Sequence, residues 1–131
     1  MSAPITITGR LAGDPELRFS ASGIAMCIFT VVTSSRRKQD DGTFADVDTT
    51  FWDCVCWRVL AENLAECVKG DRVIVAGKAV QDEWTDKETG QKRRKVKVKA
   101  DDVGVSLLFS PAKSQRMQRG GTVLDADPWA A

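Results

Sequence analysis

Histidine is absent from the chain, so the side chain that most often binds zinc or transfers protons near neutral pH is missing. Four cysteines are present at spacings that match no zinc-binding pattern: Cys27, Cys54, Cys56 and Cys67. A mixed Cys/His metal site is therefore impossible, and we expect no metal or other cofactor. In a reducing compartment the cysteines are expected to be small buried apolar residues, with a redox role or a disulfide between subunits as the alternative.

The chain also lacks long apolar stretches. No run approaches the ~20 consecutive apolar residues that a transmembrane helix needs. Residues 1–10 lack the apolar core of a signal peptide, so we expect a cytoplasmic, nucleoid-associated protein without membrane attachment. With 43% hydrophobic residues among 131, the chain has the length and apolar content of one domain with one core.

A large excess of either charge is missing as well, because the formal net charge is only +1. The charges are nevertheless unevenly placed. Residues 92–99 hold six cations and no acid, whereas Asp125 and Asp127 lie near the end of the chain. Local charge decides contact with an anionic ligand, so the net value does not exclude such a partner.

Short apolar or alternating segments bounded by turns predict an all-β domain. Residues 5–11 alternate between apolar and polar side chains. Residues 25–33 form a continuous apolar run rich in β-branched residues, which predicts the central strand of the sheet, buried on both faces. Residues 34–48 are polar and contain glycine, which predicts a long hairpin loop before a strand over residues 51–57.

A helix is predicted next along the chain. Leu60, Leu64, Cys67 and Val68 recur at helical spacing and form one buried stripe. Gly70 is expected to end the helix in a left-handed conformation.

Two more strands are predicted over residues 73–84 and 94–104, joined by a Thr-Gly turn. Residues 1–110 would then form one domain, whereas residues 111–131 lack apolar periodicity and are expected to form a disordered tail. Five strands with one helix between the third and the fourth are the plan of the OB-fold, a small Greek-key barrel that binds oligonucleotides or oligosaccharides.

The strand over residues 51–57 carries rings on both of its faces. One face holds Phe51, Asp53, Val55 and Trp57, and the other holds Trp52, Cys54 and Cys56. Exposed rings on a sheet are surfaces on which flat ligands stack, and bases are the commonest flat ligands. Core packing is the competing interpretation for a tryptophan in a strand that borders a helix.

Four segments, taken in order, resemble the bacterial single-stranded DNA-binding protein family and its actinobacterial branch in particular. They are ITGRLAGDPELRFSASGIAMCIFTVVTSS, FWDCVCWRVLAENLAE, KGDRVIVAGKAVQDEWTDKETG and VKADDVGVSL, which together span about residues 4–108. The resemblance implies an OB-fold without enzymatic activity that binds single-stranded DNA independently of sequence in replication, recombination or repair. It also implies a homotetramer built as a dimer of dimers.

The resemblance further implies base stacking by rings on the third strand and at the tip of the hairpin between the fourth and fifth strands. Phe51, Trp57 and Trp84 occupy those places. Where the family often has another stacking tryptophan, in the loop after the second long strand, this chain has Arg36 and Arg37. Arginine can cover a base plane or bind phosphate, so the loop is still expected to contact DNA.

Cations along the path between the rings are expected to contact phosphate groups. They are Arg10, Arg18, Arg36, Arg37, Lys38, Lys92, Arg93, Arg94, Lys95, Lys97 and Lys99. The competing interpretation for residues 92–99 is a solvated strand face whose cations pair across the hairpin with Asp82, Glu83, Asp86 and Glu88.

An apolar outward face is predicted to drive oligomerisation. We expect Trp52, Cys54 and Cys56 to point away from the core and, together with Ile5 and Ile7 of the first strand, to form the interface between subunits. Copies of Cys54 or Cys56 brought together by symmetry would then be candidates for a disulfide between subunits.

The C-terminus departs from the family pattern, in which an acidic run, Pro and a terminal Phe bind partner proteins. Asp125, Asp127, Pro128 and Trp129 preserve an acidic segment followed by a ring. Only two acids precede the ring and two alanines follow it, so we expect weak or absent recruitment of replication and repair proteins.

Two other functions compete with DNA binding of this kind. An OB-fold primosome or RNA-binding accessory module would show fewer rings on its strands and no GDPELRFS segment. A hydrolase using Asp46, Asp48 and Asp53 would lack partner histidines and a recognisable metal-ligand spacing.

Overall fold

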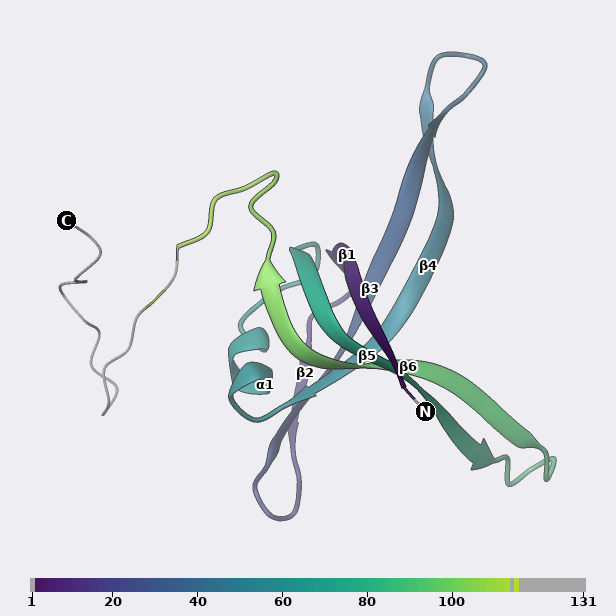
Figure 1. Cartoon of the computed structure of the whole chain (residues 1–131), viewed down its shortest axis with the longest axis vertical. Coiled ribbons are helices and arrows are strands. Elements are labelled where there is room, and N and C mark those ends of the chain that lie inside the picture. Colours follow the sequence, from purple (N-terminus) through teal and green to yellow (C-terminus); the bar gives the residue numbers. More distant parts are fainter. Residues whose placement is uncertain (1, 114, 116–131) are drawn as a thin grey trace.

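The fold is a closed β-barrel from which long β-ribbons project (Figure 1). The computed structural model describes residues 2–113 and 115. Along the chain the elements are β1 (Ala3–Leu11), β2 (Glu16–Phe19), β3 (Ala25–Lys38), β4 (Phe44–Trp57), α1 (Arg58–Leu64), β5 (Arg72–Thr85) and β6 (Lys92–Val105). The sheet order is β1-β5-β6-β4-β3-β2, and further pairing of β1 with β3 closes the barrel. The long strands and the helix follow the predicted order, with the short β2 added.

The first ribbon is formed by the outer halves of β3 and β4. The two strands stay paired from Met26 opposite Trp57 to Lys38 opposite Phe44, with one irregularity near Ser35. The prediction that residues 34–48 form a loop is therefore wrong, because only residues 39–43 connect the strands. Backbone ladder bonds hold two strands together without any buried side chain, so a polar segment that reads as a loop can extend a hairpin.

The second ribbon consists of the paired ends of β5 and β6, down to Thr85 opposite Lys92. Its turn is closed by the Asp86 N–H, which donates to the Gln91 carbonyl at 2.8 Å, and Gly90 adopts a φ of 68° there. The turn lies where the Thr-Gly pair predicts it, since glycine takes this left-handed conformation without steric cost.

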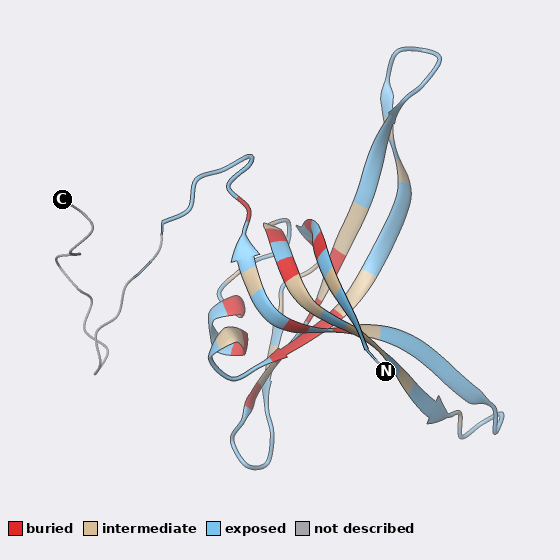
Figure 2. Ribbon diagram, in the orientation of Figure 1, coloured by how far each residue is buried: buried red, intermediate tan, exposed pale blue. Residues whose placement is uncertain are grey.

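The core lies inside the barrel, where the buried positions gather, while both ribbons are largely exposed (Figure 2). In β3, Cys27, Phe29 and Val31 point inward, and Ile28 between them is 36% exposed. The prediction that this strand is buried on both faces is wrong, because a strand in a barrel wall has one inner and one outer face.

Cys54 and Cys56 point into the core and not outward as predicted. Their exposed fractions are 1% and 0%, and Cys56 lies opposite the equally buried Cys27 in the β3–β4 register. Burial raises the pKa of Cys54 and of Cys56 to about 12. Both are free thiols in the interior. The prediction that Cys54 and Cys56 contribute to an outward interface and to a disulfide between subunits is therefore wrong.

The other predicted interface residues also face the core. Ile7 is buried, and Ile5 and Trp52 are partly buried against the same cluster. The Trp52 indole Nε1 donates a hydrogen bond to Thr33 Oγ1 at 3.0 Å, which satisfies its polar group within the chain. The prediction that Ile5, Ile7 and Trp52 form an outward face is therefore wrong, because these side chains, like the cysteines, point toward the core.

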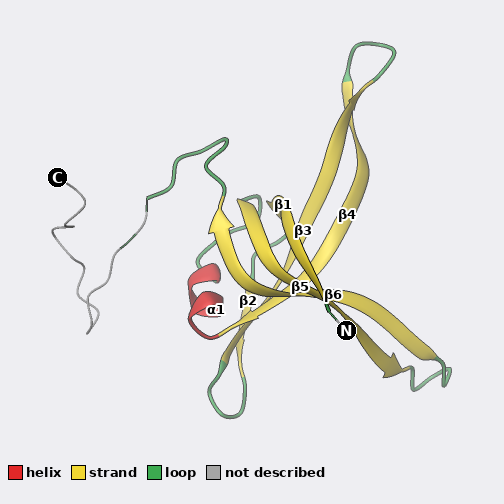
Figure 3. Cartoon of the chain, in the orientation of Figure 1, coloured by secondary structure: helices red, strands yellow, loops and turns green. Residues whose placement is uncertain are grey.

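Helix α1 packs against β3, β4 and β6 (Figure 3). Ala61 and Leu64 are buried, but the helix ends at Leu64 and leaves Val68 55% exposed, so the predicted stripe is shorter than expected. The prediction that Gly70 ends the helix is wrong, because the C-cap is Ala65; Gly70 does have the predicted positive φ, 93°, in a later turn where its N–H donates to the Leu11 carbonyl. Within the described residues, no helix is long and apolar enough to cross a membrane.

Candidate nucleic-acid interface

Strand register places one set of side chains from β4, β5 and β6, most of them exposed or half-buried, on the outer side of the sheet. Cys54 pairs with Val98 and both point inward, so Val55 and its parallel partner Lys99 lie on the outer side of the sheet, where Lys99 is exposed but Val55 is covered and only 4% exposed. The same alternation extends along all three strands. This outer face carries Phe51, Asp53, Val55 and Trp57 of β4, Lys78, Val80, Asp82 and Trp84 of β5, and Arg93, Lys95, Lys97 and Lys99 of β6.

Trp57 lies at the end of β4, where the chain leaves the sheet for the helix. Its side chain is 38% exposed, and the Lys99 Nζ lies 6.0 Å from the centroid of its ring. Across the sheet, Trp57 lies opposite Met26, which in turn lies opposite Arg18 of β2. An exposed ring flanked by cations can stack a base and hold the phosphate beside it.

Phe51 and Trp84 are the other two predicted rings, and they lie on different strands of the outer face. Phe51 is 65% exposed and precedes Trp57 by six residues, about 20 Å along an extended strand. Trp84 is 47% exposed near the tip of the second ribbon, opposite Arg93. The rings are thus separated along an open surface, as a flexible polymer would require, and do not line one closed pocket.

The cations between the rings form ion pairs with carboxylates of the same surface. Lys95 Nζ lies 2.6 Å from Asp53 Oδ2, and Lys97 Nζ lies 2.8 Å from Asp82 Oδ2. The hydrogen bond from Lys97 lowers the pKa of Asp82, so this carboxylate is charged at neutral pH. Among the described residues, no carboxylate pairs with Lys99.

Comparison with known proteins identifies the family. Residues 3–106 match the profile of the Single-strand binding protein family. The chain belongs to this family. It is 41% identical over 119 residues to the single-stranded DNA-binding protein of Mycolicibacterium smegmatis, covering 89% of this chain and 72% of that protein. Over the same length it is 42% identical to the protein of that name from Mycobacterium leprae, covering 89% and 70%.

A solved structure supports the same assignment. The small single-stranded DNA-binding protein from Streptomyces coelicolor superposes with a TM-score of 0.68 at 26% identity, covering 82% of this chain and 96% of that one. The predicted resemblance and the predicted OB-fold are both confirmed.

Other cations predicted to contact DNA lie away from the outer face, on the first ribbon and on β2. Arg36 lies 3.6 Å from Asp46 on the first ribbon, beside the exposed Arg37 and Lys38. Arg18 is paired with Glu16 of its own strand at 2.7 Å. These side chains are all exposed.

Arg10 is separated from the rings of the outer face. Its Nη1 donates to the Gly70 carbonyl at 2.9 Å, and its guanidinium lies 5.8 Å from the Phe109 ring. Arg94 also differs from its neighbours, because it points to the opposite side of the second ribbon and pairs with Glu83 at 3.2 Å. The structure brings Lys95, Lys97 and Lys99 to the outer face but leaves these two arginines outside it.

The competing interpretation of the cationic run is partly confirmed. Asp82, Glu83 and Asp86 each pair with a cation of β6, as a hairpin of opposite charges predicts. Within the described residues Glu88 forms no such pair, and Lys95 instead reaches Asp53 on the neighbouring strand β4. That pair depends on the parallel β4–β6 contact, which no local pattern indicates.

Sequence reasoning did not single out two residues whose positions suit ligand contact. Phe44 is 62% exposed at the tip of the first ribbon, opposite Lys38. Its isolation as the one large apolar residue in a polar segment was an available signal. Lys78 lies opposite Lys99 on the outer face, where alternation with Ala79 and Val80 could have indicated it.

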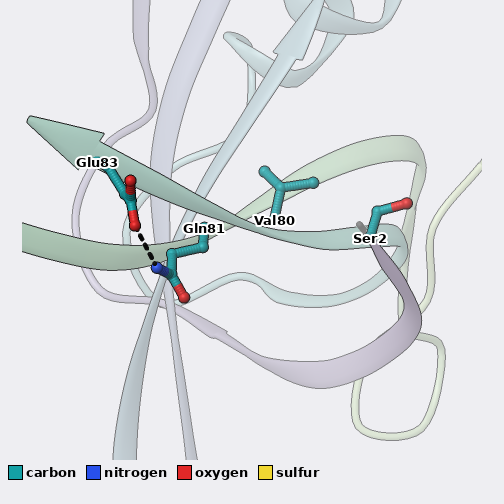
Figure 4. A pocket seen from close by; sticks show the side chains of 4 residues that line it. All are labelled: Ser2, Val80, Gln81 and Glu83. Atoms are coloured by element: carbon teal, nitrogen blue, oxygen red, sulfur yellow. Dashed lines mark hydrogen bonds between the residues drawn. The ribbon is translucent and has the colours of Figure 1, made fainter.

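A hollow beside β5 is lined by Ser2, Val80, Gln81 and Glu83, and Gln81 Nε2 donates to Glu83 Oε1 at 3.3 Å (Figure 4). It contains no ring on which a base could stack. In the part of the chain that the structure describes, no group of three or more His, Cys, Asp or Glu side chains could hold a metal ion. The predicted partner-binding residues Asp125, Asp127, Pro128 and Trp129 lie outside the described residues.

Proposed function

We propose that this chain binds single-stranded DNA independently of sequence and protects it during replication, recombination or repair, without catalysing a reaction. The observation that carries this proposal is the exposed Trp57 ring with Lys99 beside it, on a face that also holds Phe51 and Trp84. Stacking on such rings contributes about 1–3 kcal/mol per base, and every base has a π face. The relatives that share this family are named for single-stranded DNA binding.

The geometry of the outer face also explains a preference for single strands. Bases of a duplex are already stacked on one another, so exposing them to Phe51 or Trp57 requires unpairing. A single strand offers its bases at a smaller energetic cost. The cations of β6 then contact phosphate groups that either kind of DNA provides.

A gel-shift assay tests the proposal directly. The chain should retard poly-dT at concentrations that leave a duplex of equal length free, and binding should quench tryptophan fluorescence. The alternative, an OB-fold primosome or RNA-binding accessory module, predicts preference for an RNA of equal length over poly-dT. Equal binding of duplex and poly-dT would contradict the proposal.

We further propose that residues 1–110 form the binding and oligomerisation domain and that the protein is a homotetramer, a dimer of dimers, associated with the nucleoid. Support comes from family membership and from exposed apolar side chains near the end of β6, including Ile74, Val105, Leu107 and Leu108. Light scattering should report about four chains per particle. A monomer at micromolar concentration would contradict this part of the proposal.

A further inference from the structure

Asp53 occupies the centre of the outer face. It follows Phe51 by two residues and precedes Trp57 by four, so its carboxylate projects from the same side of β4 as both rings. The side chain is 40% exposed. Lys95 Nζ lies 2.6 Å from one carboxylate oxygen, and Thr30 Oγ1 donates to the other at 3.4 Å. A negative charge is thus held between the two rings of β4, on the surface proposed above to bind DNA.

Asp82 repeats this arrangement on the neighbouring strand. In the β5–β6 register it lies opposite Lys95, yet its carboxylate pairs diagonally with Lys97 at 2.8 Å. Lys95 therefore forms its ion pair with Asp53 of β4, on the other side of β6. Carboxylates and ammonium groups thus alternate across β4, β6 and β5. Lys95 and Lys97 are each already paired with a carboxylate of the protein.

Building on the proposed function, we propose that Asp53 and Asp82 are specificity-determining residues that act as built-in substitutes for phosphate. When DNA binds, a phosphate group replaces the carboxylate of Asp53 at Lys95 or of Asp82 at Lys97. Phosphate contact at these lysines therefore adds little to the free energy of binding. A single strand offsets the exchange by stacking its bases on Phe51 and Trp57. A duplex cannot stack on these rings, so the carboxylates disfavour it and other polyanions without exposed bases.

The experiment compares the full-length wild-type chain with Asp53→Asn and Asp82→Asn. Asparagine has nearly the same shape and can still accept from Thr30, but it carries no charge. Binding of labelled oligo-dT and of a blunt duplex of equal length is measured by fluorescence anisotropy over a range of NaCl concentrations. Glu62→Gln, on the exposed side of α1, is the matched control because it makes the same change in net charge away from the outer face.

Each Asp→Asn variant should bind both probes more tightly at low salt, with the duplex gaining more, so that the preference for oligo-dT falls about 3- to 10-fold. The slope of log K against log salt for oligo-dT should steepen by about 0.7, since one more cation is free to release counterions from the DNA. Glu62→Gln should leave the preference and the slope at their wild-type values.

A double-mutant cycle with Lys95→Gln separates the anion exchange from a change in folding. Lys95→Gln should weaken binding little in the wild type and more in Asp53→Asn, where Lys95 is no longer neutralised. Thermal midpoints identify any variant that fails to fold. If Asp53→Asn fails to fold, Asp82→Asn, which lies on the exposed ribbon, carries the test in its place. Unchanged or weaker binding by a folded Asp→Asn variant would overturn the inference while leaving the proposed function standing. Absence of oligo-dT binding by the wild type would overturn both.

Discussion

The Lys99 ammonium group lies 6.0 Å from the centroid of the Trp57 ring, and the two residues belong to strands that meet in the parallel β4–β6 pairing. That pairing joins parts of the chain about forty residues apart. It places a cation and an exposed ring side by side at the edge of the barrel. The outer face of this single-stranded DNA-binding protein family member is organised around this contact.

Replacing Trp57 and Trp84 together with alanine should weaken oligo-dT binding by several kcal/mol, because each ring stacks a base at about 1–3 kcal/mol. Both rings are partly exposed, so the barrel should remain folded. The measurement is anisotropy of a labelled oligo-dT, which does not depend on the tryptophans that are removed. Normal binding by the folded double variant would show that the stacking assignment is wrong.

Phe44→Ala should weaken binding of long oligo-dT by about 1–3 kcal/mol if the tip of the first ribbon contributes a further stacking ring. The side chain is 62% exposed, so the thermal midpoint should hardly change. The matched control is Phe109→Ala, which removes a ring of similar exposure, 71%, that lies beside Arg10 and Arg72 instead. Equal effects of the two variants would argue against a specific role for the ribbon tip.

Gly77→Ala should destabilise the fold by about 1–3 kcal/mol, as overpacking does in other tightly packed sites. A Cβ at this position would overlap the backbone oxygen of Lys99 and approach the Ala100 Cα to 2.8 Å, at the irregularity between Ala76 and Gly77. Urea unfolding measures the change. Gly104→Ala in β6 meets no neighbouring atom and should be nearly neutral, so equal losses in the two variants would contradict the packing argument.

The buried cysteines should resist alkylation and should make the fold sensitive to alkaline pH. Burial raises the pKa of Cys54 and Cys56 from 9.0 to about 12, so the thiolate that reacts with iodoacetamide is nearly absent at pH 8. Mass spectrometry of the folded protein should find both unmodified, whereas urea should expose them to labelling. Non-reducing electrophoresis should show no covalent dimer through these residues.

The same pKa shifts set the sign of the pH dependence. Between pH 9 and about 12 the unfolded chain releases thiol protons that the folded chain retains, so this contribution to stability is complete below pH 9 and is lost as pH rises through that window. Denaturant melts at pH 8 and pH 10.5 should show the decline. Cys56→Ala should reduce the difference between the two pH values, and an unchanged difference would contradict the assignment.

Removing residues 112–131 should leave DNA binding unchanged or slightly tighter, because the outer face defined above is built from residues 51–99 and the three cations and two acids of this segment nearly cancel. Recruitment of replication and repair proteins through the tail should be weak, since only two acids, Asp125 and Asp127, precede Trp129 in this segment. Titration of a partner of the family with a peptide of residues 120–131 tests this. Micromolar binding that Trp129→Ala abolishes would show that the tail does recruit.

Local pattern was sufficient for the order of the strands, the place of the helix and the separation of residues 51–57 into two sets of alternating side chains. These features depend on periodicity and on turn residues such as Gly90, whose effects are felt within a few positions. The prediction that Phe51 and Trp57 share a face follows from the same period and needs no tertiary information.

Which of the two faces points inward was decided only by the closed barrel. Alternation along the strand predicts that Cys54 and Cys56 share a face. That this face is buried depends on their partners on neighbouring strands, Cys27 and Phe29 of β3 and Val98 of β6. The pairing of Lys95 with Asp53 has the same origin, because β4 and β6 meet only after the chain has passed through the helix and β5. Ion pairs and burial depend on groups far apart in sequence, so they arise with closure of the sheet and are not encoded in any single segment.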